Sequence, residues 1–394
     1  VTGDSPITGV TGKGYFLNTT AGVITINLPA GVAGSIVSMA DYAATWQTNN
    51  VTVSPNGSEK IGGVNSDVIL STEGQSVTFV YIDSTQGWLN TMDSTSNVRG
   101  SEFIIATGGT ISCCGDYKIH KFTSPGTFKV CATAVVAANN LVSYAVVAGG
   151  GGGGGSYGGG GGAGGYRETK SPSTPYTASP LDGYATPGNR ITVTTTSFPI
   201  AIGGGGAGGV FPGAPYVGTN GSVSTFSSIP SAGGGGGATE SGVGTAGGSG
   251  GGGSYNTSAG GAGNTPPTTP AQGFPGGSGG QSSPHYTNGG GGGALEVGES
   301  AGPTDINGRG GVGTLTHISG SPTSYAGGGG AGGGDNPPTG GAGSPCGTGG
   351  AGSPQPGNGS PGTINTGGGG GAGTSGTGGG AGGSGIVIIR YKFQ

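Results

Sequence analysis

Glycine runs separated by short polar and aromatic inserts fill the chain from residue 149 to residue 385. Of the 105 glycines, 88 lie after residue 148, so more than a third of that part of the chain is glycine. Glycine has no side chain to bury, and it loses more backbone entropy on ordering than any other residue. The region is therefore either disordered or held together by backbone packed against backbone.

The runs have a length and composition that favour order. Typical runs are 149–155, 203–209 and 327–334, and several of them carry a single alanine. Seven residues of polyproline II helix span ~22 Å, and such helices can bond to one another where side chains are absent from the contacts. We therefore predict a polyglycine II helix bundle over 149–385, with the inserts as loops at its two ends and the single alanines on outward faces.

A flexible Gly/Ser linker is the alternative interpretation of this region. Three features argue against it: the regular alternation of runs and inserts, the scarcity of charge, and the aromatic or proline residues in most inserts. A linker would also not need the apolar, strand-like segments that flank the region on both sides. The bundle is the better prediction.

The charge content excludes several classes of partner. Charged residues make up 7% of the chain, against roughly 25% in an average globular protein, and the net charge is −4. No basic patch is present, so the sequence predicts no nucleic-acid partner. No apolar run is long enough to cross a bilayer, so we expect no membrane insertion.

The first part of the chain, 1–98, is predicted to form a mainly β domain of the sandwich type. Short alternating or β-branched segments separated by Gly, Pro, Asn and Ser turns are typical of sandwiches and barrels. Trp46, Trp88, Phe79 and Tyr81 are expected in its core or in an interface. A Ser/Thr-rich linker is expected at 93–100. The predicted strands are 22–28, 34–40, 50–54, 67–70 and 75–82.

A smaller β domain is predicted over 99–148, as the base of the bundle. Residues 117–122 and 127–131 flank a Thr-Ser-Pro-Gly turn, and this pattern predicts a hairpin. The strand-like segment 141–148 leads into the first glycine run, and 386–394 is the last apolar segment of the chain. We predict that these two segments pair, so that the glycine region leaves and re-enters one β base.

Cysteine and histidine patterns give no support for a metal site, a cofactor or catalysis. Cys113, Cys114, Cys131 and Cys346 match no zinc motif, and they are expected to be free or buried thiols; a Cys131 disulfide to Cys113 or Cys114 is the alternative. The three histidines have no nucleophile or carboxylate partner by spacing, and the acidic residues are scattered. We expect a protein that is not an enzyme and that needs no cofactor.

Several segments resemble known phage proteins. YAVVAGGGGGGG at 144–155, TSYAGGGGAGGG at 323–334 and the terminal GSGIVIIRY are similar to the glycine-rich domains of bacteriophage tail fibres and tail-tip adhesins. DYAATWQTNNVTV from Asp41 and ILSTEGQSVTFVYIDSTQGW from Ile69 resemble a β domain of fibre proteins in aquatic phages. Together the similar segments extend over nearly the whole chain.

The resemblance implies a receptor-binding protein of the virion, outside the cell. It implies a polyglycine II sandwich whose loops recognise a bacterial surface receptor, either a glycan or loops of an outer-membrane protein. It further implies other tail or fibre proteins as partners at the N-terminus, and a homotrimer formed through the β domains. The alternative from a different class is a structural subunit of a virion fibre or extracellular filament, without receptor specificity.

Counting the runs alternately up and down predicts which inserts lie far from the base. Aromatic rings in such loops can stack on sugars, and Asn, Ser and Thr can bond to hydroxyl groups. The opposite set, at the base, contains the inserts 166–190 and 265–274. The predicted receptor-binding residues of the far loops are Tyr157, Phe211, Tyr216, Tyr255, Asn256, His285, Tyr286, His317 and Tyr325.

Overall fold

The computed structural model describes residues 1–93, 98–99, 101–213, 216–281, 283, 285–302, 306–335 and 339–394. Most of the predicted linker 93–100 lies outside these residues, as does Pro215 beside the predicted site residue Tyr216. The chain divides into two compact units, Val1–Phe103 with Thr133–Ala137 and Ile104–Ala132 with Ala138–Gln394. The fold is mainly β, as the sequence predicts, and no described helix is long and apolar enough to cross a membrane.

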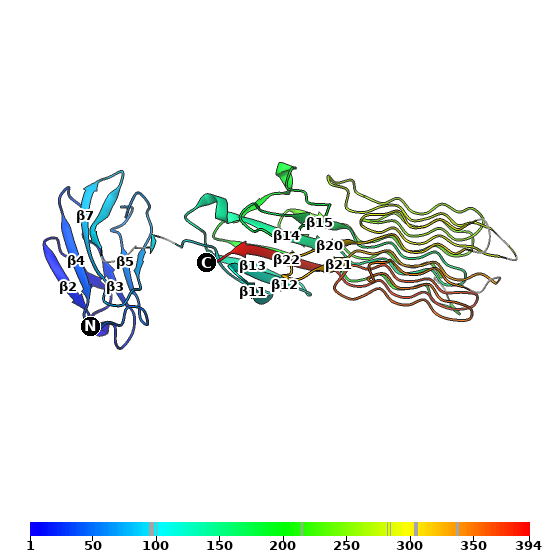
Figure 1. Ribbon diagram of the computed structural model, residues 1–394, viewed down its shortest axis with the longest axis horizontal. Helices are drawn as coiled ribbons and strands as arrows, with labels where there is room; N and C mark the ends of the chain where they lie inside the picture. The colour runs from blue at the N-terminus through cyan, green and yellow to red at the C-terminus, as the bar shows by residue number, and fades with distance from the viewer. Residues whose placement is uncertain are drawn as a thin grey trace. The chain divides into compact units, whose positions relative to one another are not determined.

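The first unit is a sandwich of two sheets (Figure 1). One sheet has the strand order β1-β3-β5-β6-β9 and the other β2-β4-β7-β8. The elements are η1 (Thr2–Asp4), β1 (Ile7–Thr8), β2 (Lys13–Leu17), β3 (Ile24–Asn27), β4 (Ile36–Asp41), β5 (Val51–Ser54), β6 (Val68–Leu70), β7 (Ser76–Asp83), β8 (Gly87–Asp93) and β9 (Val98–Arg99).

The core of this unit contains the predicted aromatic residues. Trp46, Trp88 and Phe79 are fully buried, and Tyr81 packs against them from a half-buried position. The five predicted strands correspond to β3, β4, β5, β6 and β7. The sequence prediction missed β2 and β8, whose residues alternate less regularly between apolar and polar.

The second unit begins with two facing sheets that form the base of the glycine region. Their strand orders are β10-β13-β17-β18-β19 and β11-β12-β22-β14-β15, with β16 paired to β14. The elements are β10 (Ile105–Thr107), β11 (Thr110–Cys114), β12 (Tyr117–Phe122), β13 (Gly126–Ala132), η2 (Ala137–Asn140), β14 (Leu141–Val147), β15 (Tyr166–Thr169), η3 (Pro187–Asn189), β16 (Ile191–Thr192), β17 (Ser197–Ala201), β18 (Ser224–Phe226), β19 (Ile229–Ser231), β20 (Thr314–Thr316), β21 (Thr323–Tyr325) and β22 (Ile386–Lys392).

The predicted pairing of the last strand with the segment before the first glycine run is confirmed. Strand β22 lies between β12 and β14 and is antiparallel to both, with Ala145 opposite Ile388. Six of its seven residues are buried. One face of this sheet packs on the facing sheet through residues such as Val387 and Ile389, and Ile386 and Ile388 contact the base end of the glycine bundle.

The predicted hairpin at 117–131 is wrong. Strand β12 pairs with β11 and β22, whereas β13 pairs with β10 and β17, so the turn between them carries the chain from one sheet to the other. Phe122 and Phe128, on either side of this turn, both lie in the core between the sheets. Cys131 is therefore in the sheet opposite Cys113 and Cys114. All the cysteines are free thiols, and the alternative disulfide does not form.

Hydrogen bonds in the glycine region repeat every three residues. In the first run, the N–H groups of Gly150 and Gly153 both donate to the run 378–385, each at 2.9 Å. The pair one residue further on donates to 158–165, and the next pair to 216–219. A helix with three residues per turn points every third residue to the same neighbour. The runs therefore form a polyglycine II lattice. Figure 1 shows them as wavy segments that lie side by side and extend from the base sheets.

The run 158–165 is enclosed on all sides. It donates hydrogen bonds to three neighbouring runs and accepts them from three others. A Cβ built on Gly161 would lie 2.2 Å from the carbonyl oxygen of Gly151, which is far too close for two unbonded atoms. Only glycine fits at this position, because there is no room for a Cβ atom. The neighbours are 149–155, 232–238, 248–254, 288–294, 326–334 and 367–373.

The alanines of the runs follow the predicted pattern only in part. A set of them is exposed on outward faces: Ala207, Ala246, Ala259, Ala262, Ala342, Ala351 and Ala381. The prediction is wrong for a second set, which is buried: Ala163, Ala238, Ala294, Ala326, Ala331 and Ala372. Part of the second set lies near the base, where Ala163, Ala294 and Ala326 join the rings of Tyr166 and Tyr325 in one apolar cluster.

A buried histidine is expected to make the stability of the base depend on pH. The Nδ1 of His120 lies 2.7 Å from the carbonyl oxygen of Gly108, which can only accept, so Nδ1 carries the proton. Its Nε2 therefore accepts a hydrogen bond from the Tyr391 hydroxyl, at 3.0 Å. Burial lowers the pKa of His120 below its usual 6.5. Protonation would remove the acceptor and leave a charge among aromatic rings.

The expected result is a loss of stability as the pH falls below about 6.5, because the unfolded chain then binds a proton that the folded chain excludes. The slope from this group is at most about 1.4 kcal/mol per pH unit. Thermal unfolding between pH 7.5 and 5 should show a steeper decline for the natural protein than for His120→Gln. Equal slopes in the two proteins would contradict this role of His120.

Candidate functional site

Three predicted tyrosines meet at the end of the bundle away from the base. The rings of Tyr157 and Tyr286 stack with centroids 4.5 Å apart, and Tyr255 stands edge-on to both at 6.1 and 4.9 Å. They come from three separate loops. Tyr157 and Tyr286 have φ of 57° and 46°, a left-handed conformation that is uncommon for large residues. The packing of the rings holds these turns in place.

Polar contacts fix the tyrosine cluster to its neighbours. The Tyr157 hydroxyl donates to the Asp335 carboxylate at 2.6 Å. Partial burial, and next the hydrogen bond to Asp335, raise the pKa of Tyr157. The side chain of buried Asn288 accepts from the backbone N–H of Tyr255 at 3.0 Å and donates to the Tyr286 carbonyl at 2.9 Å. The cluster is thus a connected unit rather than a set of independent rings.

A second aromatic pair lies at the same end. The rings of Phe211 and Tyr216 have centroids 5.6 Å apart, and 38% of Phe211 is exposed. The carbonyl of Tyr216 accepts a hydrogen bond from Gly155, the last glycine before the Tyr157 turn. Asn256 is exposed and His285 is half-buried. Tyr216, Asn256 and His285 therefore belong to loops at one end of the bundle, as predicted.

Two predicted site residues are at the opposite end. Tyr325 is 3% exposed and packs against Tyr166 of the base, with ring centroids 6.3 Å apart. His317 follows β20, and its carbonyl accepts a hydrogen bond from Arg390 of β22. The prediction that His317 and Tyr325 lie in the far loops is wrong. The inserts 166–190 and 265–274 are at the base, as predicted.

The error has a physical cause, because some runs contain few glycines. Residues 218–223 (GTNGSV) form a run in which Gly218 and Gly221 donate to Gly237 and Gly234. The side chain of Val223 is exposed, and the partly accessible side chain of Asn220 accepts a hydrogen bond from the backbone N–H of Gly236 at 2.9 Å. Runs on the perimeter need glycine only where they face a neighbour. A count of glycine blocks misses such runs. After each missed run, the inserts that follow are assigned to the wrong end of the bundle.

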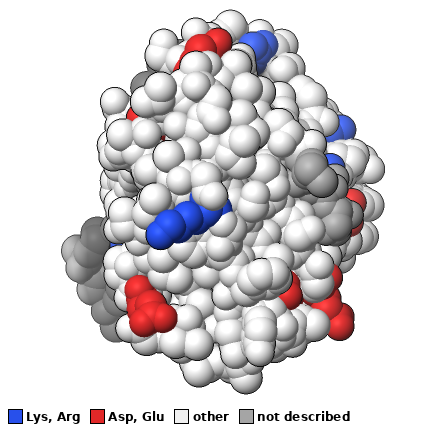
Figure 2. Space-filling view, turned by 90° about the vertical axis from the view of Figure 1, so that its left-hand side faces the viewer, with Lys and Arg blue, Asp and Glu red and all other residues white. Residues whose placement is uncertain are grey.

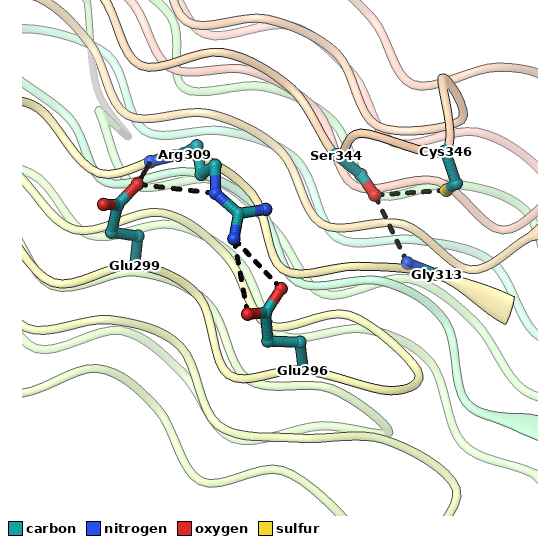
Figure 3. Close-up of polar contacts among 6 residues, drawn as sticks. All are labelled: Glu296, Glu299, Arg309, Gly313, Ser344 and Cys346. Carbon is teal, nitrogen blue, oxygen red and sulfur yellow. Dashed lines mark hydrogen bonds and ion pairs between the residues drawn. The ribbon is translucent and has the colours of Figure 1, made fainter.

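Polar side chains tie neighbouring runs together at two places in the bundle. Figure 3 shows Ser344 accepting from the backbone N–H of Gly313 at 3.3 Å, with the Cys346 thiol 3.1 Å from the same hydroxyl. It also shows Arg309 between two carboxylates: Nη2 lies 3.2 Å from Glu296 and Nε 3.6 Å from Glu299. These groups contact one another and neighbouring runs, so they act as structural ties.

Charge is sparse elsewhere. Figure 2 shows a face of the first unit, on which acidic and basic side chains are few and scattered. In the part of the chain that the structure describes, no group of three or more His, Cys, Asp or Glu residues could hold a metal ion. At the loop end, Glu240 is exposed and Asp335 binds the Tyr157 hydroxyl, so the chemistry there combines aromatic rings, hydroxyls and amides with two carboxylates.

A family model described as a glycine-rich domain matches residues 123–392. The match begins in the turn before β13 and ends with the last residue of β22. It therefore takes in most of the base strands as well as the bundle. No curated protein matches the sequence.

Proposed function

The chain belongs to the glycine-rich domain family, and on that premise we propose that it is the receptor-binding part of a virion tail fibre or tail tip. The proposal rests on one observation: seven predicted residues gather on loops at a single end of a rigid backbone lattice. A lattice of this kind lowers the ordering cost of binding, and its loops can vary without disturbing the fold.

The residues of the loop end divide into scaffold and contact groups. The rings of Tyr157, Tyr255 and Tyr286 are in contact with one another, which leaves less of their surface free for a receptor. Strained turns at functional sites cost about 1–3 kcal/mol per residue and persist only where the surroundings fix them. We assign the three tyrosines to fixing the loops, and Phe211, Tyr216, Asn256 and His285 to contact with the receptor.

A glycan is the receptor that this surface suits best. Aromatic faces and amide or hydroxyl groups recognise neutral sugars, and the contact group contains no acidic or basic residue other than His285. Loops of an outer-membrane protein are the other outcome of the test. As the resemblance implies, we propose other tail or fibre proteins as partners at the N-terminus and a homotrimer formed through the β domains. The protein would then act outside the cell, as part of the virion.

Binding of the purified full chain to candidate host cells tests the proposal. Phe211→Ser together with Tyr216→Ser should weaken saturable binding by about tenfold or more, since aromatic anchors dominate interface energies. The matched control is Ile364→Ser, which alters a residue 72% exposed in a base-side turn. Its binding should equal that of the natural chain.

Treatment of the cells separates the receptor classes. Periodate oxidation should abolish binding and protease treatment should leave it if the receptor is a glycan; the reverse result would indicate a protein receptor. A folded chain that binds no candidate host would favour the structural fibre subunit. Equal loss of binding in the loop variant and in the Ile364 control would contradict a role for the loop end.

A further inference from the structure

We infer that β11 is a pairing edge through which two copies of this chain join their base sheets. Strand β11 lies at one edge of the six-stranded sheet and pairs only with β12. Among the described residues, no other segment donates a backbone hydrogen bond to its outer side or accepts one from it. This inference does not depend on the proposed receptor.

The composition of β11 lacks the features that normally protect an edge. Its sequence, TISCC, has no charged residue and no proline, and its first four residues are exposed. Exposed edges in natural proteins usually carry a lysine, a proline or a bulge, or are very short. Ile111 is 45% exposed, so its side chain is available to a partner.

The other edges of the base sheets are protected. Strand β19 has Pro230 at its centre, which removes a backbone donor. The outer side of β15 is bridged at Glu168 by Asp182, and the carbonyl of Glu168 accepts a bond from Gly183. Strand β10 spans only 3 residues. The contrast between β11 and these edges favours a role in pairing.

The turn after β11 fixes which of its groups point outward. Gly115 and Asp116 form a two-residue turn, with Gly115 at φ 56° and Cys114 opposite Tyr117. In a two-residue hairpin the closing pair is hydrogen-bonded, and bonded pairs alternate with unbonded ones along the ladder. Cys114, Ser112 and Thr110 therefore bond to β12. Ile111 and Cys113 direct their N–H and C=O groups to the open edge.

A second copy of β11, paired in one register, can form hydrogen bonds with all the outward N–H and C=O groups of Ile111 and Cys113. With a two-fold axis at Ser112, Ile111 lies opposite Cys113 of the other copy, and both N–H and C=O groups of each residue are paired. On one face of the joined sheet, the side chain of Ile111 lies against the Cys113 thiol of the other copy. On the opposite face, the two Ser112 side chains lie against each other. No like charges meet within the strand pair. An isologous contact of this kind joins two copies only, so in the proposed homotrimer it pairs a chain of one trimer with a chain of another.

Ser112→Cys tests the register directly. Ser112 and its copy form an unbonded pair, whose Cα atoms should lie about 4.5 Å apart, within the range a disulfide can bridge. In a full chain whose natural cysteines are replaced by serine, mild oxidation should double the mass on a non-reducing denaturing gel. The matched control is Ser124→Cys, an exposed residue in the turn after β12. It should remain uncrosslinked at the same concentration.

Sedimentation supplies a second measurement that needs no cysteine replacement. In the otherwise natural chain, under reducing conditions, Ile111→Lys should halve the mass of the assembly, because it places a charge at the contact. The same change should abolish crosslinking of the Ser112→Cys variant. Absence of crosslinking in a folded Ser112→Cys variant, crosslinking in the Ser124→Cys control as well, or equal mass with and without Ile111→Lys would each overturn the proposal.

Discussion

Replacing Gly161 by alanine is expected to prevent the glycine bundle from folding normally. The added Cβ would lie 2.2 Å from the carbonyl oxygen of Gly151. The N–H of Gly161 donates to Gly370 and its carbonyl accepts from Gly329, so the residue cannot move without losing bonds on two other sides. Overpacking of well-filled cores costs about 1–3 kcal/mol, and a rigid backbone contact should exceed that range. Thermal unfolding of the purified variant measures the effect.

Gly204→Ala is the matched control. Gly204 belongs to the perimeter run 203–209, and a Cβ built on it would meet nothing within 4 Å. Its φ is not positive, so alanine fits, and the loss of unfolded-chain freedom should stabilise the protein by about 0.4–1 kcal/mol. If both variants unfolded at the temperature of the natural chain, the enclosed packing of Gly161 would be contradicted.

Ile389→Asp is expected to unfold the base and, with it, the closed end of the bundle. Ile389 is fully buried on the central strand β22, in the core between the two base sheets. A carboxylate there would have to lose its hydration or bind a proton. The cost of several kcal/mol is comparable with a typical total stability of about 5–15 kcal/mol. Soluble yield and circular dichroism of the variant would record the loss.

The same change at an exposed isoleucine tests whether the effect comes from the burial of Ile389 or from the aspartate itself. Ile105 on β10 is 53% exposed and lies in the same base. Ile105→Asp should change stability by no more than about 0.5 kcal/mol, as is usual for surface substitutions. Cooperative unfolding of Ile389→Asp at the natural temperature would show that β22 does not close the fold.

Much of this architecture could be predicted from the sequence because the main constraints are local. Alternating apolar residues identify β3 and β7, and the apolar segment around Ile388 has few places to pair. The absence of side chains in 149–155 leaves only backbone packing. The path of the chain between β12 and β13 could not be predicted, because a Pro-Gly turn suits both a hairpin and a crossing between sheets.

The candidate site was harder to predict because it depends on counting every run. Tyr157 was placed correctly because it follows the first run, 149–155. Tyr255 was placed correctly because two perimeter runs before it, 218–223 and 244–247, were missed and the two errors cancel. His317 was misplaced because perimeter runs such as 218–223 tolerate Thr, Asn and Val and resemble loops in the sequence. The stacking of Tyr157 on Tyr286 gave no sequence signal, as the two residues are far apart along the chain.

The central claim is that residues 149–385 form an ordered lattice that fixes the loops, rather than a flexible linker. Amide hydrogen exchange of the full chain tests it most directly. The account predicts slow exchange in the enclosed run 158–165, where each amide is bonded, and fast exchange at Gly205 and Gly208 on the perimeter, whose N–H groups bond to no described residue. Complete exchange of 158–165 at the first time point would contradict the lattice, and with it the rigid presentation of the loops.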